Sequence, residues 1–386
     1  MISYILPTRN RPECLARTLG ALGSLPTHDA EVIVVDNAGS PAASVASRLA
    51  NGLPTCVIRR STNEGAAGRN AGAAASDPSS AWIVMLDDDS HPMDVRFIEA
   101  LREQPTDVVG VCAEIVLPAR DTGRAIRESG GLPEVPIGCG VAYRREKYLS
   151  AMVPGMRDAF GYDPRFVFYA EEYDLAARLM LAGGRIVLDR RFIVLHEKTP
   201  AGRSMDTILR RLVRNNAWAM QRYAPYTVRG TEVRRTIAWY ARIAWKERAT
   251  LGYAAGLAET LGTLASQPRM EMDAATWDRF TGKCACRRAL LRAWSERRFA
   301  TAAIVAPGKS EHVVREGLAE IGVAIVDRED AADALVIGTL SPGPALDAYD
   351  LLQGDARVIA PWAMSAGHAG PLTRDMPGES SGRAAA

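Results

Sequence analysis

The sequence lacks the patterns that mark several classes of protein. Its six cysteines form no CxxC pair, which argues against a zinc site and against a disulfide framework. No uncharged apolar run approaches the ~18 residues that a membrane-spanning helix needs, and the apolar run at the N-terminus is too short for a secretory signal. The sequence therefore predicts a cytoplasmic protein, soluble or peripheral at the inner face of the cell membrane.

An excess of charge of one sign is also missing. The 47 Lys and Arg residues nearly balance the 45 Asp and Glu residues, which leaves a net charge of +2 and no overall signature of nucleic-acid binding. Hydrophobic residues make up 47% of the chain and charged residues 24%, both close to the globular average. The 386 residues suffice for two or three folded domains at roughly 100 to 200 residues each.

The first part of the chain has the alternation of an α/β fold. Between Ile2 and about Val116, short apolar runs alternate with helical patterns, which is typical of βαβ units in a mostly parallel sheet covered on both faces. Further strands are expected at RIVLD and IVLHE, after a helix from Glu171 to Ala182. Polar residues that follow the strands should line one crevice at the carboxyl ends of the sheet.

The remainder of the chain changes in composition. Residues 1–202 are expected to form the first domain, 203–282 a basic, aromatic helical segment with a linker near 267–282, 283–362 a small α/β domain, and 363–386 a disordered tail. The small domain is interpreted as a docking or homo-oligomerisation unit. Its APGKS turn at 306–310 lacks both GxGxxG and a complete phosphate loop, so it is assigned no nucleotide.

Between Arg203 and Arg248, eleven basic residues stand against three acidic ones, with tryptophans and tyrosines among them. This mixture suits an anionic membrane surface. The alternative is that these helices only pack on the first domain, with their arginines in water.

The strongest local feature is LDDDS, which follows the apolar strand WIVM. In an extended segment Asp87 and Asp89 would point the same way and Asp88 away from them. Paired carboxylates of this kind suit Mg²⁺ or Mn²⁺. A helix cap followed by a turn is the alternative. As an exposed, unpaired cluster, the aspartates are expected to contribute little to stability, so Asp89→Ala should leave the fold intact.

Three other segments could contribute to a site in the same crevice. NEGAAGRNAG, from Asn63, lets a helix pack close to a ligand and offers Arg69 as a cation. Glu171 and Glu172 open a helix, where an ionised carboxylate is favoured and could take a proton from a hydroxyl group. His196 ends a strand. Each segment also has a purely structural explanation when it is taken alone.

Together these segments resemble the bacterial-type family 2 inverting glycosyltransferases of the GT-A fold. The resemblance extends from Met1 to about Tyr226 and follows the order of the motifs YILPTRNRPECLARTLGAL, VVDN, NEGAAGRNAG, LDDDS, GCGVAYRREKY and AEEYDLAARLMLAGG. It implies a metal-dependent enzyme that moves a hexose or deoxyhexose from a nucleoside diphosphate sugar to a hydroxyl acceptor with inversion. The resemblance favours UDP as the nucleotide of the donor, with dTDP as an alternative, and implies Mn²⁺ or Mg²⁺ as cofactor. The product would be a glycan or a natural-product glycoside.

The resemblance also implies roles for individual residues. The nucleotide-sugar-binding positions are Pro7, Thr8, Arg9, Asp36, Asn63, Arg69, Asp87 and Asp88. The metal ligands are Asp89, Asp87 and His196, with Asp89 as the direct ligand. Glu172 is the base, and Glu171 is its alternative because this sequence reads Glu-Glu where the family usually reads Glu-Asp.

Two other functions stay open. A nucleotidyltransferase that makes sugar nucleotides would share the sheet and the acidic residues, but it should carry a glycine-rich loop after the first strand, and PTRNRPE contains no glycine. The other is an inactive scaffold that binds sugar nucleotides without turnover.

Overall fold

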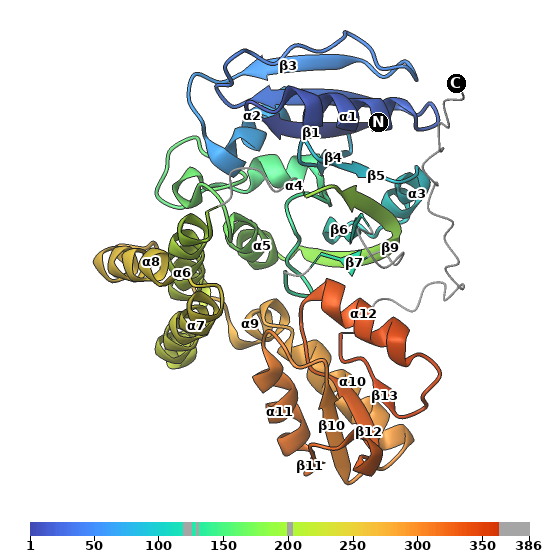
Figure 1. Cartoon of the computed structure of the whole chain (residues 1–386), viewed down its shortest axis with the longest axis vertical. Coiled ribbons are helices and arrows are strands. Elements are labelled where there is room, and N and C mark those ends of the chain that lie inside the picture. The colour runs from blue at the N-terminus through green and yellow to red at the C-terminus, as the bar shows by residue number, and fades with distance from the viewer. Residues whose placement is uncertain (119–125, 129–130, 199–203, 363–386) are drawn as a thin grey trace, which may run out of the picture.

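The structure, a computed structural model, describes residues 1–118, 126–128, 131–198 and 204–362. Within these residues a nine-stranded mixed sheet occupies the first part of the chain and a four-stranded sheet the last part (Figure 1). The strands of the large sheet are β1 (Ile2–Thr8), β2 (Ala30–Asp36), β3 (Thr55–Arg59), β4 (Trp82–Met85), β5 (Ser90–Pro92), β6 (Val108–Leu117), β7 (Ile126–Arg127), β8 (Val141–Arg144) and β9 (Arg185–His196).

The large sheet has the order β3-β2-β1-β4-β8-β6-β9-β5, with β7 paired to β6. Strands β3, β2, β1 and β4 are parallel, β8 is antiparallel to both of its neighbours, and β9 is parallel to β6. The expected mixed, mostly parallel sheet is therefore confirmed. The two strands expected at RIVLD and IVLHE form the single strand β9, whose pairing with β6 shifts register between Cys112 and Glu114.

Helices cover both faces of this sheet, as expected from its apolar strands. Alternate residues of β1 enter different cores: Tyr4 and Leu6 pack with α1 (Pro12–Gly23) and α3 (Arg96–Arg102), and Ile5 packs on the opposite face. That opposite face is covered by α2 (Gly68–Ala75), α4 (Arg145–Ser150) and α5 (Glu171–Leu181). Short 3₁₀ turns occur at η1 (Gly65–Ala67) and η2 (Pro164–Phe166).

Three long helices follow the sheet: α6 (Met205–Tyr223), α7 (Tyr226–Lys246) and α8 (Thr250–Thr263). The fully buried Arg222 fixes α6 to the first unit through ion pairs of 2.8 Å to Asp163 and 2.7 Å to Asp174. Glycines bring α8 against α6, because a Cβ atom at Gly252 would lie 2.0 Å from the Asp206 carbonyl oxygen. Among the described helices, none combines the length and the apolarity needed to cross a bilayer.

The last part of the chain is the expected small α/β unit. Parallel strands β10 (Thr301–Val305), β11 (Ala324–Ile325), β12 (Ala334–Ile337) and β13 (Val358–Ile359) pair in the order β11-β10-β12-β13. Its helices are α10 (Lys283–Glu296), α11 (Glu311–Glu320) and α12 (Pro342–Leu352), with a 3₁₀ turn η3 (Glu329–Ala331). The expected linker over 267–282 is partly helical, since it contains α9 (Ala274–Phe280) with Trp277 and Phe280 buried.

Helix α12 faces the large sheet (Figure 1). Arg127 of β7 forms ion pairs of 2.9 Å with Asp347 and 2.8 Å with Asp350 on this helix. The C-terminal unit is therefore attached to the sheet by charge as well as by α9. The division at 202, 282 and 362 stays a prediction, and the tail at 363–386 lies outside the described residues.

Candidate active site

One cavity, of about 840 Å³, collects most of the residues that the sequence singles out. It lies at the carboxyl ends of β1 and β4 and extends to α5, α6 and β9. Its lining includes Pro7, Thr8, Arg9, Asn63, Arg69, Asp87, Asp88, Glu171, Glu172 and His196. The expected crevice therefore exists, and Asp36 and Asp89 are the two predicted residues that do not line it.

The aspartate segment turns sharply instead of continuing extended. The Ser90 amide donates to the Asp87 carbonyl (3.1 Å), and the Ser90 hydroxyl accepts from the Asp87 amide (2.8 Å). The expectation that Asp88 points away from Asp89 is therefore wrong, since both bind Arg11. Asp87 and Asp89, by contrast, both lie close to His196. Asp87 faces the cavity and pairs with Arg69, whereas Asp88 and Asp89 share the guanidinium of Arg11.

Arg11, which the sequence analysis overlooked, neutralises two of the three aspartates. Its Nη1 lies 2.5 Å from Asp88 Oδ1 and its Nη2 lies 2.6 Å from Asp89 Oδ2. Burial raises the pKa of Asp88 to about 6, although Arg11 and a hydrogen bond from Thr8 oppose the rise. The sequence feature that could have indicated this role is the pair Arg9 and Arg11, because both follow β1 directly and line the crevice.

Asp89 is 1% exposed, so the expectation of an exposed, unpaired cluster is wrong. Burial alone would raise the pKa of Asp89, but the neighbouring cations His196 and Arg11 hold it well below the usual carboxyl range. The carboxylate is thus ionised and fixed between two cationic side chains. Its role as the direct metal ligand stays a prediction.

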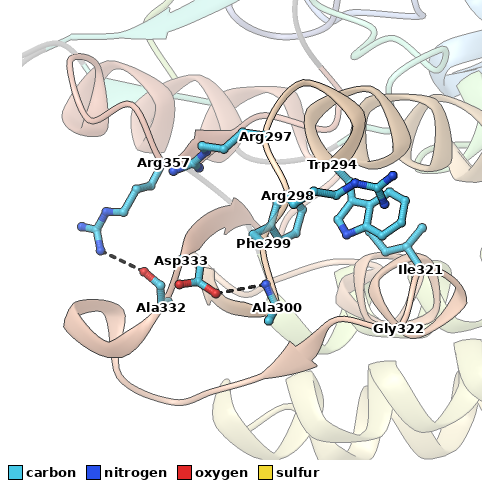
Figure 2. A pocket seen from close by; sticks show the side chains of 10 residues that line it. All are labelled: Trp294, Arg297, Arg298, Phe299, Ala300, Ile321, Gly322, Ala332, Asp333 and Arg357. Atoms are coloured by element: carbon cyan, nitrogen blue, oxygen red, sulfur yellow. Dashed lines mark hydrogen bonds between the residues drawn. The ribbon is translucent and has the colours of Figure 1, made fainter.

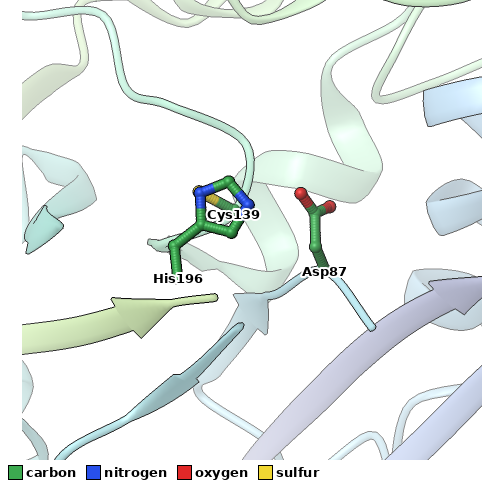
Figure 3. A group of neighbouring side chains, drawn as sticks. All are labelled: Asp87, Cys139 and His196. Carbon is green, nitrogen blue, oxygen red and sulfur yellow. The ribbon is translucent and has the colours of Figure 1, made fainter. Parts of the chain in front are cut away.

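Asp87, Cys139 and His196 form a candidate metal site (Figure 3). Their ligand atoms all lie within 4.8 Å of one another. His196 Nε2 is buried and has no hydrogen-bond partner in the described part of the chain, with Asp89 Oδ1 at 3.4 Å. On the other side of the ring, Nδ1 lies 3.2 Å from Glu128 Oε2, an arrangement that orients a metal-binding imidazole.

The chemistry of this donor set fits a hard divalent cation. Burial lowers the pKa of His196, but the nearby carboxylate of Asp89 and the contacts of Nδ1 with Cys139 and Glu128 raise it to about 12, so the ring is cationic until a metal displaces its proton. Burial raises the pKa of the Cys139 thiol, which stays protonated and is a poor ligand for Mg²⁺ or Mn²⁺. Asp87 and His196 are therefore the residues that would hold such an ion.

Glu171 and Glu172 begin α5 and line the same cavity as Asp87 and Asp88. Glu172 Oε1 accepts a hydrogen bond from the Gly138 amide (3.2 Å), whereas Glu171 Oε2 is buried without a partner among the residues described. Burial raises the pKa of both carboxyl groups, and the charge of Glu172 raises that of Glu171 further, to well above the usual range. Two adjacent buried carboxylates repel each other, so the pair retains a proton above the pH at which ordinary carboxyl groups release it.

Helix α2, which is rich in small residues, packs closely on the sheet and places Arg69 in the cavity. A Cβ atom at Gly68 would lie 2.3 Å from Asn37 Oδ1, and one at Gly72 would lie 2.7 Å from Ile5 Cγ2, so the helix lies directly on the sheet. This contact buries Arg69, whose Nη2 donates to the Leu86 carbonyl (3.2 Å) and to Asp87. Asn63 caps the turn before α2 by accepting from the Gly65 amide (3.1 Å).

Asp36 lies outside this cavity. Its carboxylate accepts from the amides of Gly39 (2.7 Å) and Ala43 (3.0 Å) and from Arg59 (2.7 Å). It lines a neighbouring cavity of about 490 Å³ between α1 and the segment 41–50. A third cavity, of about 740 Å³, lies in the C-terminal unit around Trp294 and Arg298 (Figure 2). Its lining contains one carboxylate, Asp333, so it lacks a comparable acid and metal set.

Comparisons with known proteins found a family model, a relative and solved structures that are similar to parts of this chain. Residues 3–153 match the model described as glycosyl transferase family 2. An uncharacterized glycosyltransferase of Haemophilus influenzae is 37% identical over 90 residues, which cover 23% of this chain and 29% of that protein. The match thus spans less than a third of that relative.

Two solved structures are similar in outline. Residues 1–349 of S. aureus TarS, in complex with UDP-GlcNAc, are 14% identical, with coverage of 77% of this chain and 88% of that one and a TM-score of 0.46. The mannosyltransferase PcManGT from Pyrobaculum calidifontis, in complex with GDP-Man and Mn²⁺, is 13% identical, with coverage of 67% and 86% and a TM-score of 0.43.

Proposed function

Because residues 3–153 match the model of glycosyl transferase family 2, we propose that this protein is a metal-dependent inverting glycosyltransferase. It moves a sugar from a nucleoside diphosphate sugar to a hydroxyl group of an acceptor, and a UDP-sugar is favoured over a dTDP-sugar as the donor. The observation that carries the proposal is the 840 Å³ cavity, which brings a metal-binding pair, Asp87 and His196, into the same space as a buried carboxyl pair, Glu171 and Glu172.

The donor end of the cavity is formed by the ends of β1 and β4. Pro7, Thr8 and Asn63 would contact the nucleoside, and Arg9, which forms no ion pair with any residue described, would face the phosphates. A divalent cation held by Asp87 and His196 would neutralise charge on the leaving diphosphate. Arg69 fixes the Asp87 carboxylate by pairing with it, and Glu128 fixes the His196 ring.

The acceptor end is formed by α5 and its neighbours. Glu172 would accept the proton of the acceptor hydroxyl while that oxygen attacks the anomeric carbon, and the diphosphate would leave from the opposite face, so the configuration inverts. The hydrogen bond from the Gly138 amide orients Glu172. A protonated Glu171 avoids a second negative charge beside the base.

A thermal-shift screen tests this function. UDP-, dTDP- and GDP-sugars are added with Mn²⁺, with Mg²⁺ or with EDTA, and a ligand at 100 times its Kd should stabilise the fold by about 2.7 kcal/mol. We expect stabilisation by a UDP-sugar only with metal, and its loss in Asp87→Asn but not in the exposed control Asp158→Asn. No shift with any sugar nucleotide would contradict the proposal, and binding without release of diphosphate would favour the inactive scaffold.

Contact with an anionic membrane remains part of the proposal. Five basic residues on α7 and just after its C-terminal end form no ion pair within the described chain: Arg229, Arg234, Arg242, Lys246 and Arg248. Beside them Trp245 is 81% exposed and Leu251 is 80% exposed, at the corner between α7 and α8. Cations around an exposed indole ring suit the headgroup region of an anionic leaflet.

Vesicle sedimentation tests this contact. The protein should bind anionic but not neutral liposomes, and since each Lys or Arg contributes about 1 kcal/mol, the double variant Arg242→Glu/Arg248→Glu should bind at least ~30-fold more weakly. Arg292→Glu, on α10, is the control. Equal binding to both vesicle types would remove the membrane from the proposal. Homo-oligomerisation through the C-terminal unit stays a prediction, which light scattering would check.

A further inference from the structure

The C-terminal unit contributes a residue to the catalytic cavity. Lys309, in the APGKS turn after β10, lines the cavity together with Glu172 and Tyr173. Its ammonium group donates a hydrogen bond to the Tyr173 hydroxyl and lies 4.6 Å from the centroid of that ring. The turn is fixed in place because the Leu340 amide donates to the Lys309 carbonyl (3.2 Å). The APGKS turn, for which the sequence predicted no nucleotide, thus places Lys309 in the cavity that contains Glu172.

Most cations at the donor end of the cavity are paired with carboxylates, Arg9 being the exception in the described part of the chain. Arg11 pairs with Asp88 and Asp89, and Arg69 pairs with Asp87. Lys198 pairs with Glu128 at 2.7 Å, beside His196. The cations close to the metal-binding residues are therefore already matched by carboxylates of the protein.

Two further cations that line the cavity lack such partners in the described chain. Lys309 and Arg211, on α6, have no carboxylate within ion-pair distance among the residues that the structure describes. Arg211 instead lies over the ring of Phe168, 5.7 Å from its centroid. Glu172, whose charge acts on Lys309, carries one negative charge when it serves as the base, and burial disfavours a second charge on Glu171. The charges of Lys309 and Arg211 together therefore exceed that of this carboxylate.

A partly buried lysine without an anion is unfavourable, because the charged group has lost water without gaining a counter-charge. Burial accordingly lowers the pKa of Lys309, against the opposing charges of Tyr240 and Glu172. An anionic ligand beside Lys309 would offset the free energy lost when the ammonium group loses water. Ser204 and Thr207 line the same cavity and add hydroxyl donors.

We propose that Lys309 and Arg211 form an anion subsite that binds a phosphate or carboxylate group of the acceptor. The inference rests on the proposed function, since it needs Glu172 as the base and Asp87 at the donor. An anion held beside Tyr173, the neighbour of Glu172, would position the acceptor hydroxyl against the base. The C-terminal unit would thereby take part in acceptor selection.

Titration calorimetry with inorganic phosphate and, separately, acetate tests the subsite. The protein is first saturated with UDP and Mg²⁺, so that the donor end is filled, and the titrations are repeated without UDP at matched ionic strength. Binding of phosphate but not acetate identifies a phosphorylated acceptor, and the reverse identifies a carboxylated one. No binding of either anion by the wild-type protein would overturn the inference.

The variants separate this subsite from other sites. Lys309→Gln should weaken anion binding by ~10-fold or more, the usual loss for a hydrogen bond to a charged group, and Arg211→Gln should do the same. Lys309→Arg should restore most of the affinity. Arg298→Gln is the matched control, because Arg298 lines the separate arginine-rich cavity of Figure 2.

Three results would contradict the inference. Unchanged anion affinity in Lys309→Gln would exclude the subsite, and a loss confined to Arg298→Gln would place the anion in the other cavity. A loss of UDP affinity in Lys309→Gln would assign the lysine to the donor instead. If the wild-type protein bound no UDP, the proposed function would fail, and the titrations without UDP would still report on the subsite.

Discussion

Glu171 and Glu172 are adjacent in the chain, but their surroundings separate their chemistry. Only Glu172 is oriented by a backbone hydrogen bond. Glu172→Gln should keep donor affinity and lower kcat by roughly 10² to 10⁴, the usual contribution of a positioned base, and Glu171→Gln should lower it less. In the wild-type protein kcat should fall as the pH drops through the raised pKa of Glu172, above the ordinary carboxyl range. The reverse ranking of the two variants would make Glu171 the base.

The buried carboxyl group of Glu171 also makes stability depend on pH. Burial raises its pKa, and Glu172 raises it further, so the folded protein keeps a proton that the unfolded chain releases at ordinary carboxyl pH. The stabilisation from this group is complete below the unfolded pKa and is lost as the pH rises through the folded pKa. Urea unfolding should therefore show that Glu171→Gln gains stability, relative to wild type, between pH 4 and pH 8. A constant difference would contradict the raised pKa.

Asp89 is a structural residue whatever its role toward the metal. It is ionised, 1% exposed and paired with Arg11 at 2.6 Å. Asp89→Ala should therefore lower the free energy of unfolding by about 3 to 5 kcal/mol, as the loss of one partner of a buried pair does. Asp327→Ala, at an exposed position without a positive φ, is the control. A loss below about 1 kcal/mol in urea unfolding would show that Arg11 and His196 readjust without cost.

At the residue scale the sequence predicted which side chains meet but not how they pair. Aspartates after a strand, a helix that opens with two glutamates and a histidine at a strand end are visible as patterns, and all lie at or beside one cavity. Arg11 was not predicted, because its partners are about 77 residues away in the chain. The directions of the three aspartate side chains depend on the short turn between Asp87 and Ser90. A turn this short has no hydrophobic periodicity from which they could be predicted.

Helix α2 illustrates how an element positions the site. Gly72 leaves no room for a side chain, since a Cβ atom there would lie 2.7 Å from Ile5 Cγ2 and 3.0 Å from Val35 Cγ2. Gly72→Ala should therefore cost about 1 to 3 kcal/mol of stability through overpacking. Gly20→Ala, in α1 with no atom within 4 Å of the added methyl group, should instead stabilise by about 0.5 to 1 kcal/mol. Chemical denaturation of both variants measures the contrast, and equal effects would contradict the packing of α2.

Elements with a long, strong pattern were predicted, and short or polar ones were not. Strands β1, β2, β4 and β6 are apolar runs, and α5 has a clear apolar face. Strands β5 and β7, of three and two residues, are too short to have a period. Strand β9 was divided in two because Asp189, Arg190 and Arg191 interrupt its apolar pattern while the backbone pairing continues.

At the scale of the molecule, one hydrophobic core joins the two α/β units. Buried side chains from Ile5 of the large sheet to Ile359 of the small sheet belong to a single cluster, which passes through Tyr173, Phe280 and Leu290. We therefore expect one unfolding transition, with coincident midpoints by tryptophan fluorescence and by far-ultraviolet circular dichroism. Two separated transitions would show that the units unfold independently.

The contact between the two α/β units could not be predicted from the sequence. Hydrophobic patterning predicted a second α/β unit over 283–362, but nothing local indicated that its APGKS turn would meet α5. The meeting depends on contacts between distant segments, such as those of Arg127 with Asp347 and Asp350. The residue that joins the two units at the cavity, Lys309, therefore became visible only in three dimensions.

Release of nucleoside diphosphate is the most direct test of the proposed catalysis. Wild-type protein incubated with a UDP-sugar and Mn²⁺ should release UDP over many turnovers, with water as the acceptor if no other is present. The release should cease with EDTA, fall by at least ~10²-fold in Asp87→Asn and Glu172→Gln, and persist in Asp158→Asn. Metal-independent release, or equal rates in all four proteins, would contradict catalysis by this cavity.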